Sequence, residues 1–136
     1  MIYLPDTNAI SVFLRGQDDR LNRLMTEHWE ELRLSTIVIA EREYGIIRHK
    51  SGQRYKERFE GMVRLLPQVD FNRTDASQYA VIRTKLESVG RGIGPMDTLI
   101  AAQALRLGAT VVTHNLAEFK RVPKLKVVNW QTSSPK

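Results

Sequence analysis

The 136-residue sequence contains no cysteine, and this absence excludes several kinds of site at once. Disulfide bonds, zinc sites built from thiolates and thiol nucleophiles are all excluded. No apolar run approaches the length needed to cross a bilayer. The first residues also lack the basic segment and the long apolar stretch of a signal peptide. We therefore expect a soluble cytoplasmic protein without a membrane partner.

The composition is that of one folded domain with a basic excess. Hydrophobic residues make up 42% and charged residues 26% of the chain, which are globular values. The net charge is +6, and it is unevenly distributed. Residues 1–70 contain 11 Lys/Arg against 11 Asp/Glu, whereas residues 71–136 contain 10 against 4. A basic surface kept for solubility and a surface for a polyanionic partner both explain this excess.

Short apolar segments alternate with helical patterns, which indicates an α/β protein. Strands are expected over residues 2–4, 32–34, 69–71, 110–113 and 126–130. Helices are expected after residue 6 and over residues 19–30, 36–50, 53–66, 75–89, 96–107 and 115–119. Strands that are apolar on both faces favour a parallel sheet covered by helices. In such sheets ligands bind beyond the carboxyl ends of the strands, so residues at those ends are candidates for a site.

Asp6 lies at such a carboxyl end, directly after the first strand. A helix N-cap is one explanation for an aspartate here. The dipole of a helix also favours an ionised carboxylate at its N-terminus. An ionised carboxylate in this place could hold a cation as well as cap the helix. The sequence at this position leaves both roles open.

Glu41 is expected to be partly buried, because it lies on or beside an apolar stripe of its helix. The residues of that stripe are Ile37, Ala40, Tyr44 and Ile47. A buried carboxylate costs several kcal/mol unless it is compensated. Either an ion pair with an arginine or a bound cation would compensate it.

Asp97 is expected at the edge of the core, in the first turn of a helix that is apolar nearly all round. A favourable interaction with the helix dipole is the alternative explanation. Asp6, Glu41 and Asp97 together would offer oxygen ligands without sulfur. Such ligands suit Mg²⁺ or Mn²⁺ rather than Zn²⁺.

The strand at 110–113 ends in a second polar segment that contains His114, Asn115 and Glu118. If this strand lies beside the first one, Asp6 comes close to Asn115 or Glu118. Of the three histidines, His114 alone is expected near this site. His28 is expected to face the core, and His49 to lie on the surface.

Four segments resemble motifs of a known family. Residues 4–8 (LPDTN) resemble the opening motif of PIN-domain proteins, and residues 34–45, around Glu41, resemble their second motif. Residues 94–102, around Asp97, resemble the third. Residues 112–123, together with Trp130, resemble the closing segment of VapC toxins. The motifs occur in order and at family spacing over essentially the whole chain.

The resemblance implies a three-layer α/β/α PIN domain over residues 1–131, with a central, mostly parallel sheet of four to five strands and a polar tail at 132–136. It implies an endoribonuclease whose Mg²⁺, replaceable by Mn²⁺, is held by Asp6, Glu41 and Asp97. It also implies a homodimer and a toxin–antitoxin pair, in which a VapB-type antitoxin blocks the site. Similarity to enteric VapC toxins suggests tRNA as the RNA substrate, specifically initiator tRNA cut in its anticodon stem-loop.

Two other functions are compatible with the same sequence. One is a PIN-type nuclease in RNA processing without a toxin role. The other is a noncatalytic nucleic-acid-binding module whose acidic residues serve structure. Retention of all the motifs argues against the second, because binding RNA requires no inward-facing carboxylates.

The sequence departs from the family pattern at two positions. Pro5 stands where the family has an apolar strand residue, and it is expected to end the first strand early. Asn115 stands where many PIN domains have a fourth aspartate. Glu118, three residues later, is the alternative candidate for this fourth catalytic position.

Further candidates concern the substrate. Thr7 and Asn8, at a helix N-terminus, are expected to donate to a phosphate or to orient Asp6. Four cationic side chains could contact the RNA backbone, although a plain solvated surface is the alternative. They are Arg91, in the glycine-rich loop over residues 90–95, and Lys120, Arg121 and Lys124.

Overall fold

Five short parallel strands form the centre of the domain in the computed structural model, which describes residues 1–132. They are β1 (Tyr3–Pro5), β2 (Leu34–Ser35), β3 (Gln68–Val69), β4 (Thr110–Val112) and β5 (Lys126–Val128). β4 lies between β1 and β5, and β2 pairs with β3. A bridge between Tyr3 and Leu32 joins these two ladders. The predicted parallel sheet is confirmed, although it is divided at this bridge.

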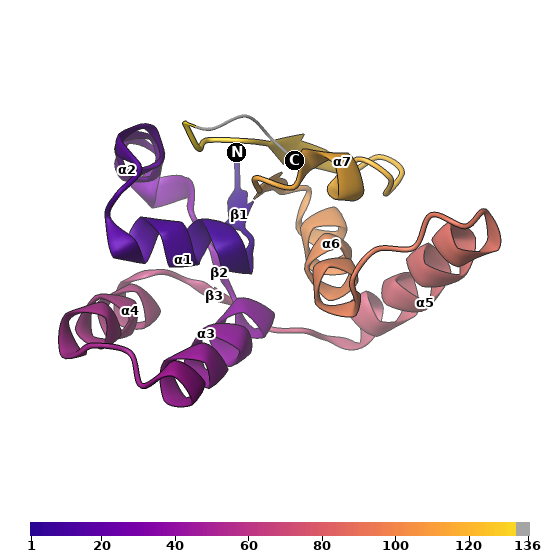
Figure 1. Cartoon of the computed structure of the whole chain (residues 1–136). Coiled ribbons are helices and arrows are strands. Elements are labelled where there is room, and N and C mark those ends of the chain that lie inside the picture. The colour runs from indigo at the N-terminus through magenta and orange to yellow at the C-terminus, as the bar shows by residue number, and fades with distance from the viewer. Residues whose placement is uncertain (133–136) are drawn as a thin grey trace.

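Helices cover both faces of the sheet. In chain order they are α1 (Thr7–Arg15), α2 (Asp19–Glu27), α3 (Thr36–His49), α4 (Gln53–Leu65), α5 (Arg73–Ser88), α6 (Pro95–Leu107) and α7 (Leu116–Phe119). Figure 1 shows α1 and α2 on one side of β1, and α6, with α5 packed against it, on the other. This arrangement gives the three predicted layers.

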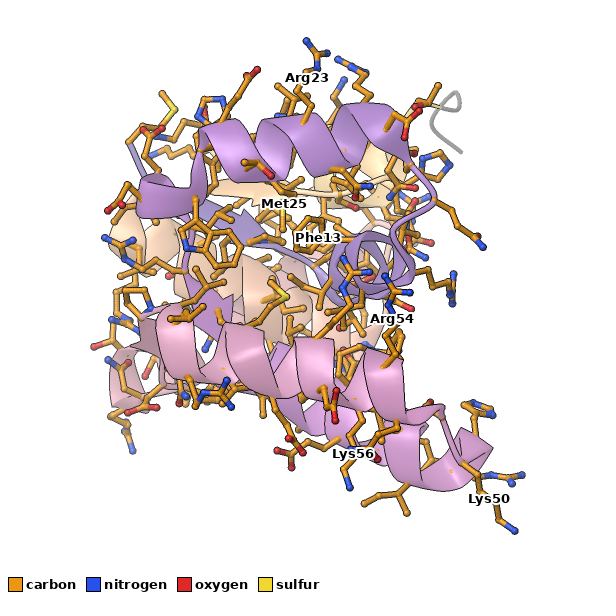
Figure 2. The ribbon with its side chains drawn as sticks, turned by 90° about the vertical axis from the view of Figure 1, so that its left-hand side faces the viewer. Phe13, Arg23, Met25, Lys50, Arg54 and Lys56 are labelled. Atoms are coloured by element: carbon orange, nitrogen blue, oxygen red, sulfur yellow. The ribbon has the colours of Figure 1, made fainter. Side chains whose placement is uncertain are left out.

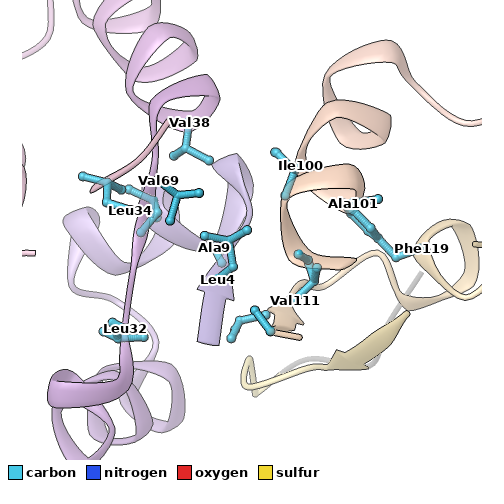
Figure 3. Packing of buried hydrophobic residues seen from close by; sticks show 14 of the residues in the cluster. Leu4, Ala9, Leu32, Leu34, Val38, Val69, Ile100, Ala101, Val111 and Phe119 are labelled. Atoms are coloured by element: carbon cyan, nitrogen blue, oxygen red, sulfur yellow. The ribbon is translucent and has the colours of Figure 1, made fainter. Parts of the chain in front are cut away.

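The core lies between these layers. Leu4 of β1 and Val111 of β4 are opposite each other in the register, and both are fully buried. Figure 3 shows them in one cluster with Ala9 of α1 and Ile100 of α6. Burial of a large apolar side chain contributes about 1.5–3 kcal/mol. This packing fixes α1 and α6 against the carboxyl ends of β1 and β4.

α6 is the central helix, as its apolar sequence predicted. Residues 100–104 are all buried, including the polar Gln103. The Gln103 side chain accepts a hydrogen bond from the Ser35 hydroxyl at 2.5 Å and donates one to the Val69 carbonyl at 3.0 Å. Because both partners belong to β2 and β3, these bonds fix the rotation of α6 about its axis.

Pro5 belongs to β1, so the prediction that it ends the strand early was wrong. On the side of β4, the next N–H along the chain, that of Asp6, donates to the Val112 carbonyl at 3.0 Å. Because hydrogen-bonding direction alternates along a strand, the Pro5 nitrogen faces the other side, toward Leu32. No ladder continues there in residues 1–132. The missing N–H therefore leaves the ladder between β1 and β4 intact.

Two helix boundaries also differ from those predicted. The helix expected over residues 75–89 begins earlier, at Arg73, because Asn72 caps α5. The side chains of Asn72 and Asp75 each accept the other's N–H at 3.0 Å, which forms a capping box. The helix expected over residues 19–30 ends at Glu27, and a 3₁₀ turn follows at Trp29–Glu31.

The C-terminal segment is described as far as Thr132. This residue donates its N–H and its hydroxyl to the Asp18 carboxylate, at 3.0 and 2.7 Å. The rest of the tail expected at 132–136 lies outside the described residues. Among residues 1–132, none of the helices has the length and apolarity needed to span a membrane.

Candidate active site

The carboxyl ends of β1 and β4 open into a cleft of about 420 Å³. The N-terminal ends of α1 and α6 and the middle of α3 surround it. Its acidic and amide side chains include those of Asp6, Glu41, Asp97 and Asn115. Segments separated by up to about 100 residues therefore meet here, at the place expected for a parallel sheet.

Asp6 is at once a helix cap and a residue of the cleft. Its carboxylate accepts a hydrogen bond from the Ala9 N–H at 2.8 Å, which caps α1. The residue is 4% exposed. Burial raises the pKa of the Asp6 carboxyl, while hydrogen bonds from Ala9 and Thr113 oppose the rise and nearby Glu41 adds to it. The cap predicted from the sequence is present in a carboxylate that also lines the cleft.

Glu41 reaches the cleft from α3. The Thr7 hydroxyl donates a hydrogen bond to Glu41 Oε1. Within residues 1–132, Glu41 forms no ion pair with an arginine or a lysine. The alternative that the sequence left open for this carboxylate, a structural ion pair with an arginine, is therefore not observed.

The predicted apolar stripe of α3 was wrong. Tyr44 and Ile47 are 65% and 78% exposed, whereas Val38 and Gly45 are buried. α3 carries apolar residues on more than one face, so periodicity alone did not identify the face that packs inward. Glu41 lies three residues after Val38 and four before Gly45, and hence on the true buried face.

Asp97 is half-buried in the first turn of α6. Burial raises the pKa of its carboxyl from 3.8 to about 7, and repulsion by three other carboxylates contributes. Those carboxylates belong to Asp6, Glu41 and Glu118. A favourable helix dipole does not explain this arrangement, because it would stabilise one negative charge and not four.

Asn115 and Glu118, the two candidates for the fourth catalytic position, are hydrogen-bonded to each other. Asn115 Nδ2 donates a hydrogen bond to Glu118 Oε2 at 2.8 Å, and the Asn115 N–H donates to the Thr113 hydroxyl at 2.9 Å. Asn115 lines the cleft, and Glu118 stands behind it, near enough to raise the pKa of Asp97. The amide thus holds the Glu118 carboxylate beside the cleft.

The donor set fits a divalent cation by its chemistry. Carboxylate and amide oxygens without sulfur favour Mg²⁺ or Mn²⁺, and mutually repelling carboxylates are relieved by a cation. In the described part of the chain, no three side chains of His, Asp or Glu lie close enough to one another to hold a metal ion. The fit therefore rests on charge and donor type.

Thr7 and Asn8, which were predicted to contact a phosphate or to orient Asp6, both line the cleft. The Thr7 hydroxyl is bonded to Glu41, so it orients that carboxylate. Asn8 Oδ1 accepts a hydrogen bond from Gln131 Nε2 at 3.2 Å. Contact with a phosphate stays a prediction for both residues.

The four side chains predicted to contact RNA do not line the cleft. Arg121 donates to the Gly92 carbonyl at 3.1 Å, and Lys124 lines a separate hollow beside α5 and α6. Arg91 and Lys120 are exposed. Contact of this group with RNA stays a prediction.

Two arginines and a histidine line the cleft although none of them was predicted to. They are Arg15, Arg42 and His49. His49 is exposed, as predicted, but it also lines the cleft, so the prediction that His114 alone lies near the site was wrong. The even charge balance of residues 1–70 concealed both arginines, because counting charges over a half-chain does not locate them in space.

The fold and the cleft define a parallel α/β domain with an acidic centre, and known proteins share this architecture. The PIN domain family model matches residues 3–125. Ribonuclease VapC2 of Rickettsia felis is 35% identical over 132 residues, covering 96% of this chain and 98% of the relative. The tRNA(fMet)-specific endonuclease VapC of Salmonella typhimurium is 27% identical, covering 94% and 97%.

A solved structure agrees with these relatives. The crystal structure of VapBC2 from Rickettsia felis, bound to a DNA fragment from their promoter, superposes with a TM-score of 0.85 at 32% identity. The alignment covers 96% of this chain and all of the matched chain. The chain therefore belongs to the PIN-domain family and, within it, to the VapC ribonucleases.

Proposed function

We propose that this chain is the toxin of a type II toxin–antitoxin system and acts as a Mg²⁺-dependent endoribonuclease. The observation that carries the proposal is the meeting of three carboxylates, those of Asp6, Glu41 and Asp97, in one cleft, where burial and their mutual repulsion raise the pKa of the Asp97 carboxyl. Binding of RNA alone gains nothing from such a cluster, because carboxylates repel phosphates. A cluster that needs a cation is instead suited to hydrolysis of a phosphodiester.

Asp6, Glu41 and Asp97 would hold the cation, with Mn²⁺ able to substitute. When bound, Mg²⁺ supplies charge for the phosphoryl oxygens and increases the acidity of water. The Ala9 N–H and the Thr7 hydroxyl keep the Asp6 and Glu41 carboxylates directed into the cleft. Hydrolysis in line with the leaving 3′ oxygen gives 5′-phosphate and 3′-hydroxyl ends.

For the fourth catalytic position we propose Glu118, held by Asn115. Thr113 in turn holds the Asn115 backbone, so the asparagine acts as a positioning residue. This division explains how an asparagine can stand where other PIN domains have an aspartate. The negative charge is then supplied from three residues further along the chain.

The substrate and the protein partner follow from the relatives. One relative is named a tRNA(fMet)-specific endonuclease, and we propose tRNA for this chain, with initiator tRNA cut in its anticodon stem-loop. The structure from Rickettsia felis is a VapBC complex, and we propose a VapB-type antitoxin that blocks the cleft. Both partners would place the activity in the cytoplasm.

A homodimer is supported by apolar side chains that face outward. Tyr44 and Ile47 on α3 are exposed, as are Val81 and Val89 on or next to α5. Both helices flank α6 (Figure 1). Sedimentation equilibrium should give twice the mass of one chain, and a mass of 15.6 kDa would contradict the dimer.

Cleavage of tRNA by the purified protein should require the metal. We expect cleavage with Mg²⁺, none in EDTA, and recovery when Mn²⁺ or Mg²⁺ is added in excess. Mapping of the 5′ ends after induction in cells would identify the substrate and the cleaved bond. Cleavage that persists in EDTA would overturn the metal-dependent site. Binding of RNA without cleavage in any metal would indicate the noncatalytic module.

The increase in Tm that Mg²⁺ produces should be greater at about pH 8 than at about pH 6. Because the pKa of Asp97 is raised from 3.8 to about 7, folding favours its protonated form. The stability that the protonated Asp97 carboxyl contributes to the folded state is therefore lost as the pH rises from 3.8 toward 7. Mg²⁺ requires the ionised carboxylate, so below that pH it must displace a proton, and its affinity falls by about tenfold per pH unit. Equal shifts of Tm at the two pH values would contradict this linkage.

A further inference from the structure

Two arginines and a histidine line one side of the same cleft, beside the carboxylates. They are Arg15 at the end of α1, and Arg42 and His49 of α3. The same three residues also line a second hollow of about 320 Å³, which extends to Ser51 and Tyr55. The two hollows adjoin along these three side chains, and we call them together the groove. It runs from the carboxylates to the turn between α3 and α4.

Arg42 is held in place but not neutralised. Its Nη1 donates to the Ser11 and Tyr55 hydroxyls at 3.4 and 3.3 Å, which are long bonds to uncharged partners. Its Nε is shielded from solvent and has no hydrogen-bond partner. Neither Arg42 nor Arg15 forms an ion pair within residues 1–132. A guanidinium in this state keeps its charge and spare donors for an anion.

Positive charge continues at the far end of the groove. The segment over residues 48–56 contains four Lys/Arg and no Asp/Glu. They are Arg48, Lys50, Arg54 and Lys56. Figure 2 shows Lys50, which directly follows α3, and Arg54, in the first turn of α4. A negative polymer that leaves the carboxylates in this direction therefore meets Arg42 and Arg15 in the groove itself and the further cations only near the α3–α4 turn, although Lys56 lines a different hollow.

We propose that Arg42 and Arg15 are positioning residues that bind the RNA phosphate next to the scissile one. The strand then runs along the groove toward the α3–α4 turn. The inference rests on the proposed ribonuclease function and names the substrate contacts of that site. The carboxylates accept a phosphate only through a cation, whereas the next phosphate meets the forked donors of arginine directly. Fixing that phosphate orients the scissile bond.

The test compares Arg42→Ala, Arg42→Lys and Arg15→Ala with Arg23→Ala, which removes an exposed cation of α2 that lies outside the cleft. Cleavage is measured with Mg²⁺. Affinity for a short single-stranded oligoribonucleotide is measured in EDTA, so that the RNA stays intact, at several salt concentrations. Each arginine-to-alanine variant should raise KM and Kd by about tenfold, with kcat changed less. The slope of log affinity against log salt should decrease by about 0.7 for each phosphate that the variant no longer neutralises.

The controls separate charge from structure. Arg42→Lys should keep the salt slope, because it keeps the charge. Arg15 makes no hydrogen bond or ion pair in residues 1–132, so Arg15→Ala removes charge without disturbing a bond that holds the fold. Arg23→Ala should leave KM, Kd and the slope unchanged. A smaller slope for Arg23→Ala, with unchanged slopes for Arg42→Ala and Arg15→Ala, would overturn the inference.

Failure of the inference and failure of the proposed function give different results. If the wild-type protein cleaves RNA but the arginine variants keep its KM, Kd and salt slope, the groove is wrong and the ribonuclease stands. If the wild-type protein neither binds nor cleaves RNA, the proposed function is wrong, and the groove falls with it.

Discussion

Replacement of Asp97 by asparagine should reduce RNA cleavage by on the order of 10³-fold or more, because a metal centre contributes several kcal/mol to the transition state. Asp97 is the carboxylate on which burial and three other acids act together. The amide has nearly the same shape but no charge, so the variant should fold normally. Without metal it should be at least as stable as the wild type near neutral pH, since a repelling charge is removed. Single-turnover cleavage and thermal unfolding measure the two effects.

Asp19→Asn is a matched control for this variant. Asp19 also lies in the first turn of a helix, α2, but it is exposed and outside the cleft. Its replacement should leave cleavage and the response to Mg²⁺ unchanged. If Asp97→Asn retained wild-type cleavage, or lost the fold together with activity, the catalytic assignment of Asp97 would have to be abandoned.

Replacement of Arg106 by alanine should lower the free energy of unfolding by about 3 kcal/mol, the cost of leaving a buried carboxylate without its partner. Asp75 is 0% exposed, and its two oxygens accept hydrogen bonds from Arg106 Nε and Nη2 at 2.8 and 3.0 Å. We expect a loss at the low end of the range for breaking a buried ion pair, because the Arg106 side chain is 27% exposed. Urea denaturation followed by circular dichroism measures the change.

Arg83→Ala is the corresponding control for an exposed ion pair. Arg83 and Glu87 are one helical turn apart on α5, at 3.1 Å, and both side chains are more than half exposed. Solvent screens such a pair, so its loss should leave the free energy of unfolding nearly unchanged. Equal losses for Arg106→Ala and Arg83→Ala would contradict the special role of the buried pair.

Much of the acidic site was predictable because its residues stand at positions that local sequence marks. Asp6 follows an apolar strand and caps a helix, and Asp97 opens a helix that is apolar on all sides. Both features depend on immediate neighbours in the chain. Parallel strands were also predicted, but the pairing of β1 with β4 was only a condition of the prediction, and the structure shows that it brings Asp6 and Asn115 to one edge.

Glu41 was predicted for a partly mistaken reason. The expected stripe with Tyr44 and Ile47 faces solvent, yet Glu41 lies on the buried face of α3. Several faces of that helix are apolar, and contacts with α1 and α6 decide which one is covered. Pro5 shows the same limit, because its tolerance in β1 depends on which strand lies on each side.

The acidic cluster is thus the part of this protein that its sequence determined. Periodicity and helix capping over a few residues gave the order of the strands and helices and placed carboxylates at their ends. The tertiary structure alone decided what surrounds that cluster. Arg42 meets Ser11 across 31 positions of sequence, and Arg15 joins it in the same cleft. Such neighbours result from packing of α1, α3 and α4 against one another. No local pattern encodes them, so the groove beside the carboxylates emerged only with the fold.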